Sequence, residues 1–473
     1  MTRLRFPADF LWGTATSSFQ IEGAAAVDGR RPSIWDTFCE VPGAIAGGDD
    51  GRPGVDHYHR YREDVALMAD LGFNTYRFSV SWSRVLDGDR ANPAGMDFYS
   101  RLVDELLDAG ITPWLTLYHW DLPDSLPGGW TNRDTAYRFA DYALAMHDRL
   151  GDRVENWTTL NEPWCSSFLS YAAGEHAPGH TDNVESVRAV HHLLLAHGLA
   201  TSALREAGGP DRKLGITLNF GPVVPASDDP ADLDVVRRVD GTMNRLFVHP
   251  LFAGEYPADV RHDLAPWWPD DLVADGDLVL IATPIDVLGV NYYSTNMMRA
   301  AHPGEQTRHR VVRGRQLATP HITAPDAVHV PRGLPLTDMG WEVDPDGLRK
   351  LLLWLHTTYT GPAGTALVIT ENGAAYPDLK GPDGTIDDQD RIGYVRDHLA
   401  AVHAAMADGA DVRGYLQWSL IDNFEWAFGY AKRFGIVAVD ENLDRIPKAS
   451  AHWYASVVGS GGLDAEEGPW RTQ

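Results

Sequence analysis

Cysteine is nearly absent from this sequence. Only Cys39 and Cys165 occur among 473 residues, and neither belongs to a Cys-x-x-Cys spacing. Two cysteines are too few for a disulfide framework, and the missing spacing excludes the common zinc and redox motifs. We therefore expect a protein of a reducing compartment that needs no metal ion or other cofactor.

Basic residues and long apolar runs are also scarce. The chain has 40 Lys and Arg against 66 Asp and Glu, which gives a formal net charge of −26. This charge repels nucleic acid and anionic lipid surfaces, so we expect neither as a partner. No apolar run reaches the length of a membrane span, and the first residues lack the apolar core of a secretory signal. The sequence predicts a cytoplasmic protein that acts on a neutral small molecule.

What the sequence does contain is a repeated alternation of strand and helix patterns. With 44% hydrophobic and 22% charged residues, the chain is typical of a globular protein with a large core. Segments of helical periodicity are predicted at 56–71, 98–107, 137–150, 191–207, 348–359 and 392–407. They alternate with eight apolar, β-branched runs at 10–15, 74–79, 112–120, 155–161, 214–219, 286–293, 366–371 and 412–418.

This alternation predicts an α/β protein with one closed (β/α)8 TIM barrel and long loops after its strands. The first strand is not followed by Gly-x-Gly-x-x-Gly, which argues against a dinucleotide-binding sheet. No change of composition marks a domain boundary. We therefore assign residues 1–458 to one catalytic barrel domain and 459–473 to a loose C-terminal tail. The polar stretch 301–336 is predicted as a long surface loop after the sixth strand.

Polar and aromatic side chains gather at the ends of the predicted strands, which in a barrel meet at the face that carries the active site. Arg77 stands where alternation would place a core residue, and a buried arginine needs a carboxylate partner. His57 and His59 are not predicted to bind metal, because they do not share a helix face. The residues at strand ends are Gln20, Arg77, His119, Glu162, Asn219, Tyr293, Glu371 and Trp418.

Two of these strands end in a carboxylate beside an asparagine. Glu162 lies in Thr158-Thr-Leu-Asn-Glu-Pro163, and Glu371 lies in Val368-Ile-Thr-Glu-Asn-Gly373. Either motif alone is typical of a turn. Two carboxylates that face each other on rigid strands can break a glycosidic bond, one protonating the leaving oxygen and the other attacking or stabilising the sugar cation.

Four stretches, in order over almost the whole chain, resemble the signatures of glycoside hydrolase family 1, the β-glucosidase family of retaining enzymes. They are Phe10-Leu-Trp-Gly-Thr-Ala-Thr-Ser-Ser-Phe-Gln-Ile-Glu-Gly23, Thr159-Leu-Asn-Glu-Pro163, Ile369-Thr-Glu-Asn-Gly373 and Trp418-Ser-Leu-Ile-Asp-Asn-Phe-Glu-Trp426. The resemblance implies an enzyme that removes terminal β-D-glucosyl, and also β-galactosyl or β-fucosyl, residues from oligosaccharides or glycosides. It also implies a place in carbohydrate metabolism such as cellulose degradation.

The resemblance implies a role for each matching position. Glu162 would be the general acid/base and Glu371 the nucleophile, with carboxyl groups about 5–5.5 Å apart. Arg77 and Tyr293 would keep Glu371 ionised, whereas Glu162 needs a raised pKa in a desolvated setting. Trp341 would hold the leaving group. The residues implied around the sugar are Gln20, His119, Trp120, Asn161, Tyr293, Trp418, Glu425 and Trp426.

Two other functions stay open. Relatives that cleave 6-phospho-β-glycosides carry small polar and basic residues where this chain has Glu425, and a carboxylate there opposes a phosphate. A non-catalytic sugar-binding barrel would be expected to have lost Glu162 or Glu371, and both are present. The oligomeric state is not predicted.

Overall fold

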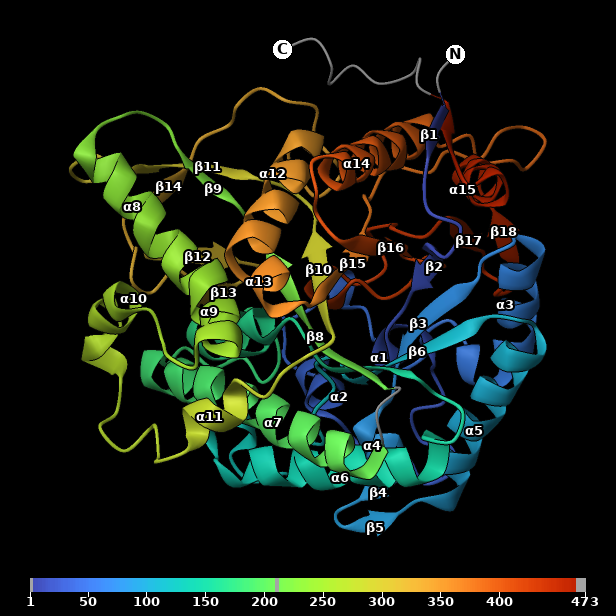
Figure 1. Ribbon diagram of the computed structural model, residues 1–473, viewed down its shortest axis with the longest axis horizontal. Helices are drawn as coiled ribbons and strands as arrows, with labels where there is room; N and C mark the ends of the chain where they lie inside the picture. The colour runs from blue at the N-terminus through green and yellow to red at the C-terminus, as the bar shows by residue number, and fades with distance from the viewer. Residues whose placement is uncertain (1–2, 209–211, 465–473) are drawn as a thin grey trace.

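The computed structural model describes residues 3–208 and 212–464. In it, eight parallel strands close into a barrel and follow one another around it in chain order (Figure 1). The last strand pairs with the first, with Gly414 opposite Leu11, so the barrel has no open edge. The predicted (β/α)8 barrel is confirmed. Its strands are β2 (Leu11–Ala15), β3 (Thr75–Ser79), β6 (Thr112–Tyr118), β7 (Asn156–Asn161), β8 (Lys213–Phe220), β10 (Val287–Tyr292), β15 (Ala366–Asn372) and β16 (Val412–Trp418).

Helices surround the barrel and connect its strands (Figure 1). Among the described residues, no helix is both long and apolar enough to cross a membrane. The long helices are α3 (His57–Asp70), α5 (Pro93–Asp108), α6 (Asp134–Leu150), α7 (Asn183–Gly208), α8 (Pro230–Asp240), α12 (Pro345–Leu355), α14 (Gln389–Ala407) and α15 (Ala449–Ser460). The shorter ones include α1 (Ser18–Ile21), α2 (Ile34–Phe38), α4 (Trp82–Val85), α9 (Leu246–Ala253), α10 (Ala258–Asp263), α11 (Asp277–Ile281), and α13 (Gly361–Ala363).

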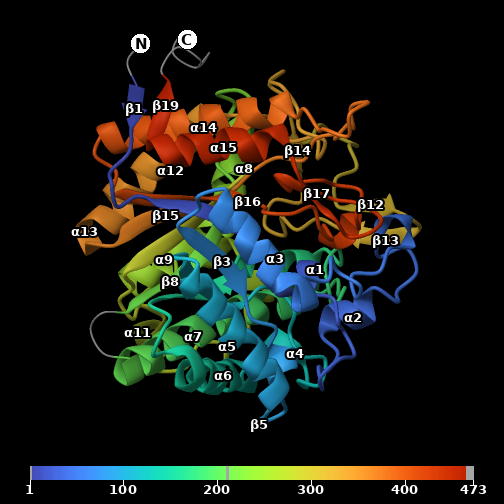
Figure 2. The same cartoon turned by 90° about the vertical axis from the view of Figure 1, so that its right-hand side faces the viewer.

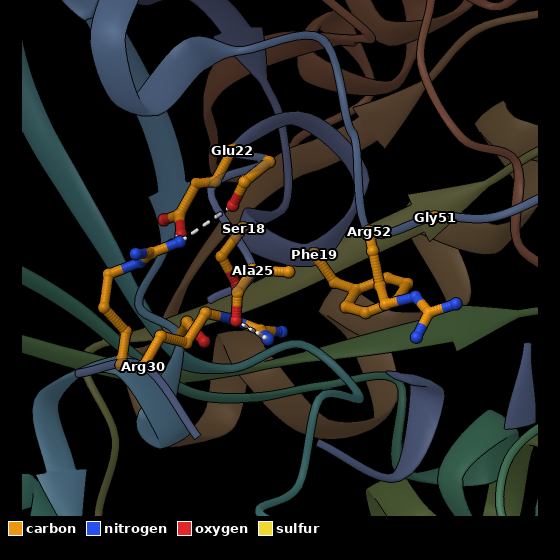
Figure 3. A pocket seen from close by; sticks show the side chains of 10 residues that line it. Ser18, Phe19, Glu22, Ala25, Arg30, Gly51 and Arg52 are labelled. Atoms are coloured by element: carbon orange, nitrogen blue, oxygen red, sulfur yellow. Dashed lines mark hydrogen bonds and ion pairs between the residues drawn. The ribbon is translucent and has the colours of Figure 1, made fainter. Parts of the chain in front are cut away.

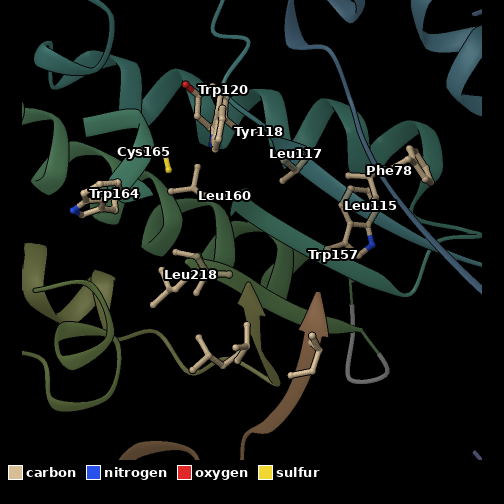
Figure 4. Close-up of a cluster of buried hydrophobic side chains, with 14 of the residues drawn as sticks. Phe78, Leu115, Leu117, Tyr118, Trp120, Trp157, Leu160, Trp164, Cys165 and Leu218 are labelled. Atoms are coloured by element: carbon tan, nitrogen blue, oxygen red, sulfur yellow. The ribbon is translucent and has the colours of Figure 1, made fainter. Parts of the chain in front are cut away.

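The interior is filled by large side chains on both sides of the strands. Trp114 packs inside the barrel against Val287 and Val368, whereas Trp157 belongs to the main core outside it (Figure 4). Both tryptophans are buried, and Trp354 is half-buried against the main core. Close strand approach requires glycine at position 13, where a Cβ would lie 1.7 Å from the carbonyl oxygen of Thr75.

The segment 301–336 is more regular than the predicted surface loop. It contains the hairpin of β12 (His309–Val312) with β13 (Arg315–Ala318), and β14 (Ala327–His329). β14 pairs with β11 (Asn296–Ala300), which also pairs with β9 (Val223–Pro225). Buried residues anchor the segment, namely Leu317 and the short run from Ile322 to Ala324. They are spaced among Arg, His and Pro, so the polar composition concealed them.

The two ends of the described chain lie side by side (Figure 2). β1 (Arg3–Arg5) pairs antiparallel with β19 (Gly462–Asp464). The sequence places the end of the barrel domain at 458, but α15 and β19 continue regular structure to Asp464, because the terminal strand finds a partner in β1. The remaining residues of the predicted tail, 465–473, lie outside the described residues.

A buried ion pair joins the segments that follow β2 and β3. Arg84 Nε donates to Glu22 Oε2 at 2.8 Å, and Arg84 Nη2 donates to the carbonyl oxygen of Gly23 at 3.0 Å. The Tyr99 hydroxyl donates to the second carboxylate oxygen of Glu22. Glu22, Ser18 and Arg30 line a small pocket behind α1 (Figure 3). Glu22 directly follows α1, the helix that carries Gln20. The ion pair therefore fixes the end of the helix that positions this predicted site residue.

Replacing Glu22 with alanine leaves the Arg84 guanidinium buried without its carboxylate. Removing one partner of a buried pair costs about 3–5 kcal/mol. We expect Glu22→Ala to lower the free energy of unfolding by this order, measured by chemical denaturation. Asp87→Ala breaks the exposed pair between Arg31 and Asp87 and should leave the denaturation midpoint unchanged. Equal effects of the two substitutions would contradict the importance of burial here.

Candidate active site

The predicted site residues meet at the carboxyl ends of the barrel strands. Asn161 is the last residue of β7 and Trp418 the last of β16, while Arg77 lies in β3 and Glu371 next to the end of β15. The remaining residues follow strand ends. Gln20 lies in α1, His119 and Trp120 follow β6, Glu162 follows β7, Tyr293 follows β10, Trp341 precedes α12, and Glu425 and Trp426 follow β16.

Glu371 is held by two donors from different strands. Arg77 Nη1 donates to Glu371 Oε1 at 2.6 Å, and the Tyr293 hydroxyl donates to Glu371 Oε2 at 2.7 Å. Arg77 and Glu371 are both almost fully buried. Both carboxylate oxygens therefore accept charge-stabilising hydrogen bonds, and the buried arginine has the carboxylate partner that the sequence requires.

Arg77 also fixes the orientation of the Asn161 amide. Its Nη2 donates to Asn161 Oδ1 at 2.6 Å, and a guanidinium has no acceptor atom. The other amide atom, Asn161 Nδ2, therefore faces His119 Nε2 at 3.0 Å as a donor. Burial, followed by the charge of Arg77, lowers the pKa of His119 well below its ordinary value. His119 is thus neutral with its proton on Nδ1, and that atom has no protein partner among the described residues.

Glu162 accepts two hydrogen bonds of its own. Asn291 Nδ2 donates to Glu162 Oε1 at 2.6 Å, and the Cys165 thiol donates to Glu162 Oε2 at 3.2 Å. Asn291 also contacts Asn161 Oδ1 at 3.1 Å. The two glutamates are therefore joined through Asn291, Asn161 and Arg77, but only Glu371 contacts the cation directly.

These different surroundings separate the two carboxyl groups electrostatically. Burial first, and then the charge of Glu371, raise the pKa of Glu162 to about 8. Burial also raises the pKa of Glu371, but the Arg77 guanidinium and the Tyr293 hydroxyl lower it again. Since the cation and two strong donors stabilise Glu371 in its charged form, the single proton of the pair resides on Glu162 at neutral pH. The site then holds one neutral acid and one carboxylate.

Glu425 is a third acidic group at the site. Burial, followed by the charges of Glu371 and Glu162, raises its pKa to about 8. Within residues 3–208 and 212–464, its carboxyl group forms no hydrogen bond with another side chain, in contrast to the two other glutamates. A neutral carboxyl group whose oxygens form no other hydrogen bond can both donate to and accept from adjacent hydroxyl groups.

Two of the predicted sugar ligands use their donors inside the protein. Both donations of Gln20 Nε2 are taken, by Asn423 Oδ1 at 2.9 Å and by the Phe424 carbonyl oxygen at 2.8 Å. Trp120 Nε1 donates to the Asn161 carbonyl oxygen at 3.0 Å. Gln20 Oε1 already accepts from Ser17 Oγ at 2.6 Å, so Gln20 can offer a ligand only the second lone pair of this oxygen, rather than a donor and an acceptor. Trp120 can offer only its ring.

The aromatic residues of the site form two connected groups. Trp418 lies parallel to the His119 ring, with centroids 5.7 Å apart, and packs in one cluster with Tyr293 and Trp341. Trp341 itself contacts Tyr293 at 5.4 Å between centroids. Trp426 packs against Trp120 at 4.5 Å. These flat rings beside the carboxyl groups are suited to the apolar faces of a sugar and of its leaving group.

Three residues of the site have a strained backbone conformation. Trp120, Glu162 and Trp426 all have positive φ, at 77°, 50° and 49°, although none is glycine. Such residues are uncommon and concentrate at functional sites, where the surrounding contacts hold them. Glycine is required beside the nucleophile candidate, because a Cβ at Gly373 would lie 1.8 Å from the Trp418 carbonyl oxygen.

Sequence reasoning missed Asn291 and Cys165 as contacts of Glu162. Asn291 is a polar residue near the end of an apolar strand, which is the same signal that identifies the other site residues. Cys165 follows Glu162 by three residues, one helical turn, but nothing in the sequence indicates that its thiol faces the carboxylate. Asn219 lies at a strand end as predicted, without a hydrogen bond from its side chain among those found in the described chain.

Two buried carboxyl groups of opposite protonation, set among aromatic rings at the mouth of a barrel, define the site of a glycoside hydrolase. Comparison with known proteins leads to the same class. The bifunctional β-D-glucosidase/β-D-fucosidase of Bifidobacterium breve is 48% identical over 96% of this chain and 98% of its own. The thermostable β-glucosidase B of Thermobispora bispora is 50% identical over 97% and 92% of the two chains.

The crystal structure of the psychrophilic β-glucosidase from Micrococcus antarcticus is similar to this one with a TM-score of 0.93. The two sequences are 49% identical, with coverage of 98% of this chain and all of that chain. The sequence model of glycosyl hydrolase family 1 matches residues 2–463. The chain therefore belongs to glycosyl hydrolase family 1.

Protonation of Glu425 should appear in the pH dependence of stability. Between its ordinary pKa of 4.5 and about 8, the folded protein holds this proton and the unfolded chain does not. The resulting stabilisation is complete below pH 4.5 and is lost as the pH rises through about 8. Glu425→Gln should therefore lose less stability across this range than the wild type, as measured by denaturation at several pH values.

The exposed Glu441, in the turn between β17 (Val437–Val439) and β18 (Arg445–Pro447), provides the matched control. Glu441→Gln should retain the wild-type slope of stability against pH. A Glu425→Gln variant with that same slope would contradict a protonated Glu425.

Proposed function

We propose that this protein is a retaining β-glucosidase that hydrolyses terminal β-D-glucosyl residues by double displacement, and also accepts β-D-fucosyl and β-D-galactosyl residues. The proposal rests on one observation, the buried glutamate pair in which Glu371 contacts Arg77 and Glu162 does not. The names of the relatives agree with it, including the bifunctional enzyme of Bifidobacterium breve.

In the first step, a carboxylate oxygen of Glu371 attacks the anomeric carbon while Glu162 gives its proton to the departing oxygen. The Arg77 and Tyr293 hydrogen bonds keep Glu371 ionised for this attack. In the second step, the now ionised Glu162 takes a proton from water, and the water oxygen displaces Glu371 from the sugar. Each glutamate returns to its starting state.

The remaining residues bind the sugar. Trp418 provides an apolar face, Glu425 and His119 Nδ1 provide donors, and Gln20 Oε1 provides an acceptor for ring hydroxyl groups. Trp341 contacts the leaving group from the side of Tyr293. Short β-glucan fragments, such as those released from cellulose, suit this arrangement, and two relatives from Thermotoga neapolitana are named 1,4-β-D-glucan glucohydrolases. The two free cysteines favour the cytoplasm.

A 6-phosphoglycoside is a poor fit to this site. The cations of the loop after β16 are already engaged, because Lys432 donates to Asp338 Oδ2 at 3.0 Å and Arg433 donates to the Asp378 carbonyl oxygen at 3.4 Å. A phosphate dianion would therefore lie near the ionised Glu371 without a cation of this loop to neutralise it.

We expect aryl β-glucoside to be turned over with a kcat/KM at least about 100-fold higher than its 6-phospho analogue, which corresponds to roughly 2.7 kcal/mol of discrimination. Aryl β-fucoside and aryl β-galactoside, assayed in parallel, should also be cleaved. Equal rates for the phosphorylated and neutral glucosides would favour a phosphoglycosidase, and no turnover of any member would favour a non-catalytic barrel.

Leaving-group chemistry separates the two glutamates. A dinitrophenyl group departs as an anion without a proton, so Glu162→Ala should still form the glycosyl-enzyme and show a burst of dinitrophenolate. The variant should then stall, because Glu162 also activates the water. Added azide should restore turnover and give the β-glycosyl azide, identified by NMR.

Glu371→Ala is the matched variant. It should show no burst with the same substrate, because no leaving group replaces the nucleophile, and azide should give the α-glycosyl azide. A burst from Glu371→Ala and none from Glu162→Ala would reverse the two roles.

A further inference from the structure

The double-displacement scheme gives no task to the thiol of Cys165. Cys165 begins the π-helix η3 (Cys165–Ala172), and its Sγ lies 3.2 Å from Glu162 Oε2. Its main-chain N–H donates to the Glu162 carbonyl oxygen at 3.0 Å, so the backbone sets the thiol against the carboxyl group. The side chain is buried, next to Leu160 and Trp164 (Figure 4).

The hydrogen-bond network determines which oxygen of Glu162 carries its proton. Asn161 Oδ1 accepts from Arg77, so the Asn291 amide atom that faces it must be a nitrogen. The same nitrogen donates to Glu162 Oε1. Oε1 accepts from an amide at 2.6 Å, whereas Oε2 faces only the weak thiol donor at 3.2 Å, so the proton of neutral Glu162 is placed on Oε2, the oxygen that faces the Cys165 sulfur.

A thiol treats the two protonation states of Oε2 differently. Burial, followed by the charge of Glu162, raises the pKa of Cys165 well above its ordinary value, so the group stays S–H. Towards an ionised carboxylate it is a charge-assisted donor, but towards a protonated one it is only a weak acceptor. The contact therefore strengthens when Glu162 is charged and releases the proton-bearing oxygen when Glu162 is neutral.

We propose that Cys165 is a positioning residue for the acid/base, whose thiol orients the ionised Glu162 for the activation of water in the second step and leaves the protonated Glu162 free in the first. This proposal rests on the proposed function. A hydroxyl group is a stronger donor than a thiol and would stabilise the ionised Glu162 at least as well, but it is also a better acceptor and would contact the protonated form. An aliphatic side chain would form a hydrogen bond with neither form.

Other charges also act on Glu162 and must stay constant in a test. Glu371 and Arg77 act on it from β15 and β3, and Glu425 and Tyr293 lie in the loops after β16 and β10. Glu175 acts on the Cys165 thiol from beyond η3. None of them is altered by a substitution at Cys165.

Cys165→Val removes the donor at similar volume, and Cys165→Ser restores a donor. For Cys165→Val, the high-pH limb of kcat/KM for an aryl β-glucoside should move upwards by roughly 0.5–1 pH unit, because the ionised form of Glu162 loses a hydrogen bond. With dinitrophenyl β-glucoside, the steady-state rate after the burst should fall about 3-fold to 10-fold, while the burst itself stays fast.

Cys165→Ser should return the limb to the wild-type position or below it. Cys39→Val, at the other free cysteine, is the matched control and should leave both measurements unchanged. If Cys165→Val does not fold, Cys165→Ala takes its place with the same expectations. The S–H stretching band of Cys165 can be assigned from the difference between the infrared spectra of the wild type and Cys165→Val. In the wild type, this band should shift over the pH range in which kcat/KM falls.

Glu162→Gln separates failure of this proposal from failure of the proposed function. A high-pH limb that persists in Glu162→Gln would show that Glu162 is not the acid, and would overturn both. A limb that disappears in Glu162→Gln but does not move in Cys165→Val, or that moves equally in the Val and Ser variants, would overturn the role of Cys165 alone.

Discussion

The buried pair of Arg77 with Glu371 is the contact on which the rest of the site depends. A guanidinium and a carboxylate can be buried together only when each neutralises the other and their remaining hydrogen-bonding atoms are satisfied. Arg77 meets this condition by also donating to Asn161, and Glu371 by also accepting from Tyr293. The barrel makes this arrangement achievable, because β3 and β15 bring together residues that lie 294 positions apart in the chain.

This pair also explains why two glutamates in one site behave differently. Both are buried, and burial alone would make both neutral. The cation makes them different, since it donates directly to Glu371 but is linked to Glu162 by hydrogen bonds only through the amides of Asn161 and Asn291. Its charge is the smallest of the influences on the pKa of Glu162. The position of one arginine thus decides which carboxyl group keeps the proton, and the proposed assignment of acid and nucleophile rests on it.

The loops add what the strands cannot provide. Trp120, Glu162 and Trp426 adopt positive φ just beyond strand ends, which turns side chains towards the site at a cost in backbone energy that the packed core supports. Residues proposed to bind the sugar are themselves held by the protein, as in Gln20, whose amide nitrogen donates to Asn423 and Phe424. Such side chains offer a ligand fewer atoms, in fixed directions, and this favours specificity.

The sequence by itself determined the barrel and the positions of both glutamates. Strand periodicity, helix periodicity and polar residues at strand ends are local patterns, and a closed barrel places all strand ends on one face.

The hydrogen-bond partners of the site residues were decided only by the tertiary structure. Asn291 lies 129 residues from Glu162, and the few buried anchors of 301–336 lie in a polar stretch. Neither the amide that Gln20 has already used, nor the thiol that faces Glu162, nor the protonation of Glu425 is encoded in a period or a motif. Each depends on burial and on atoms from distant segments, which exist as neighbours only after folding.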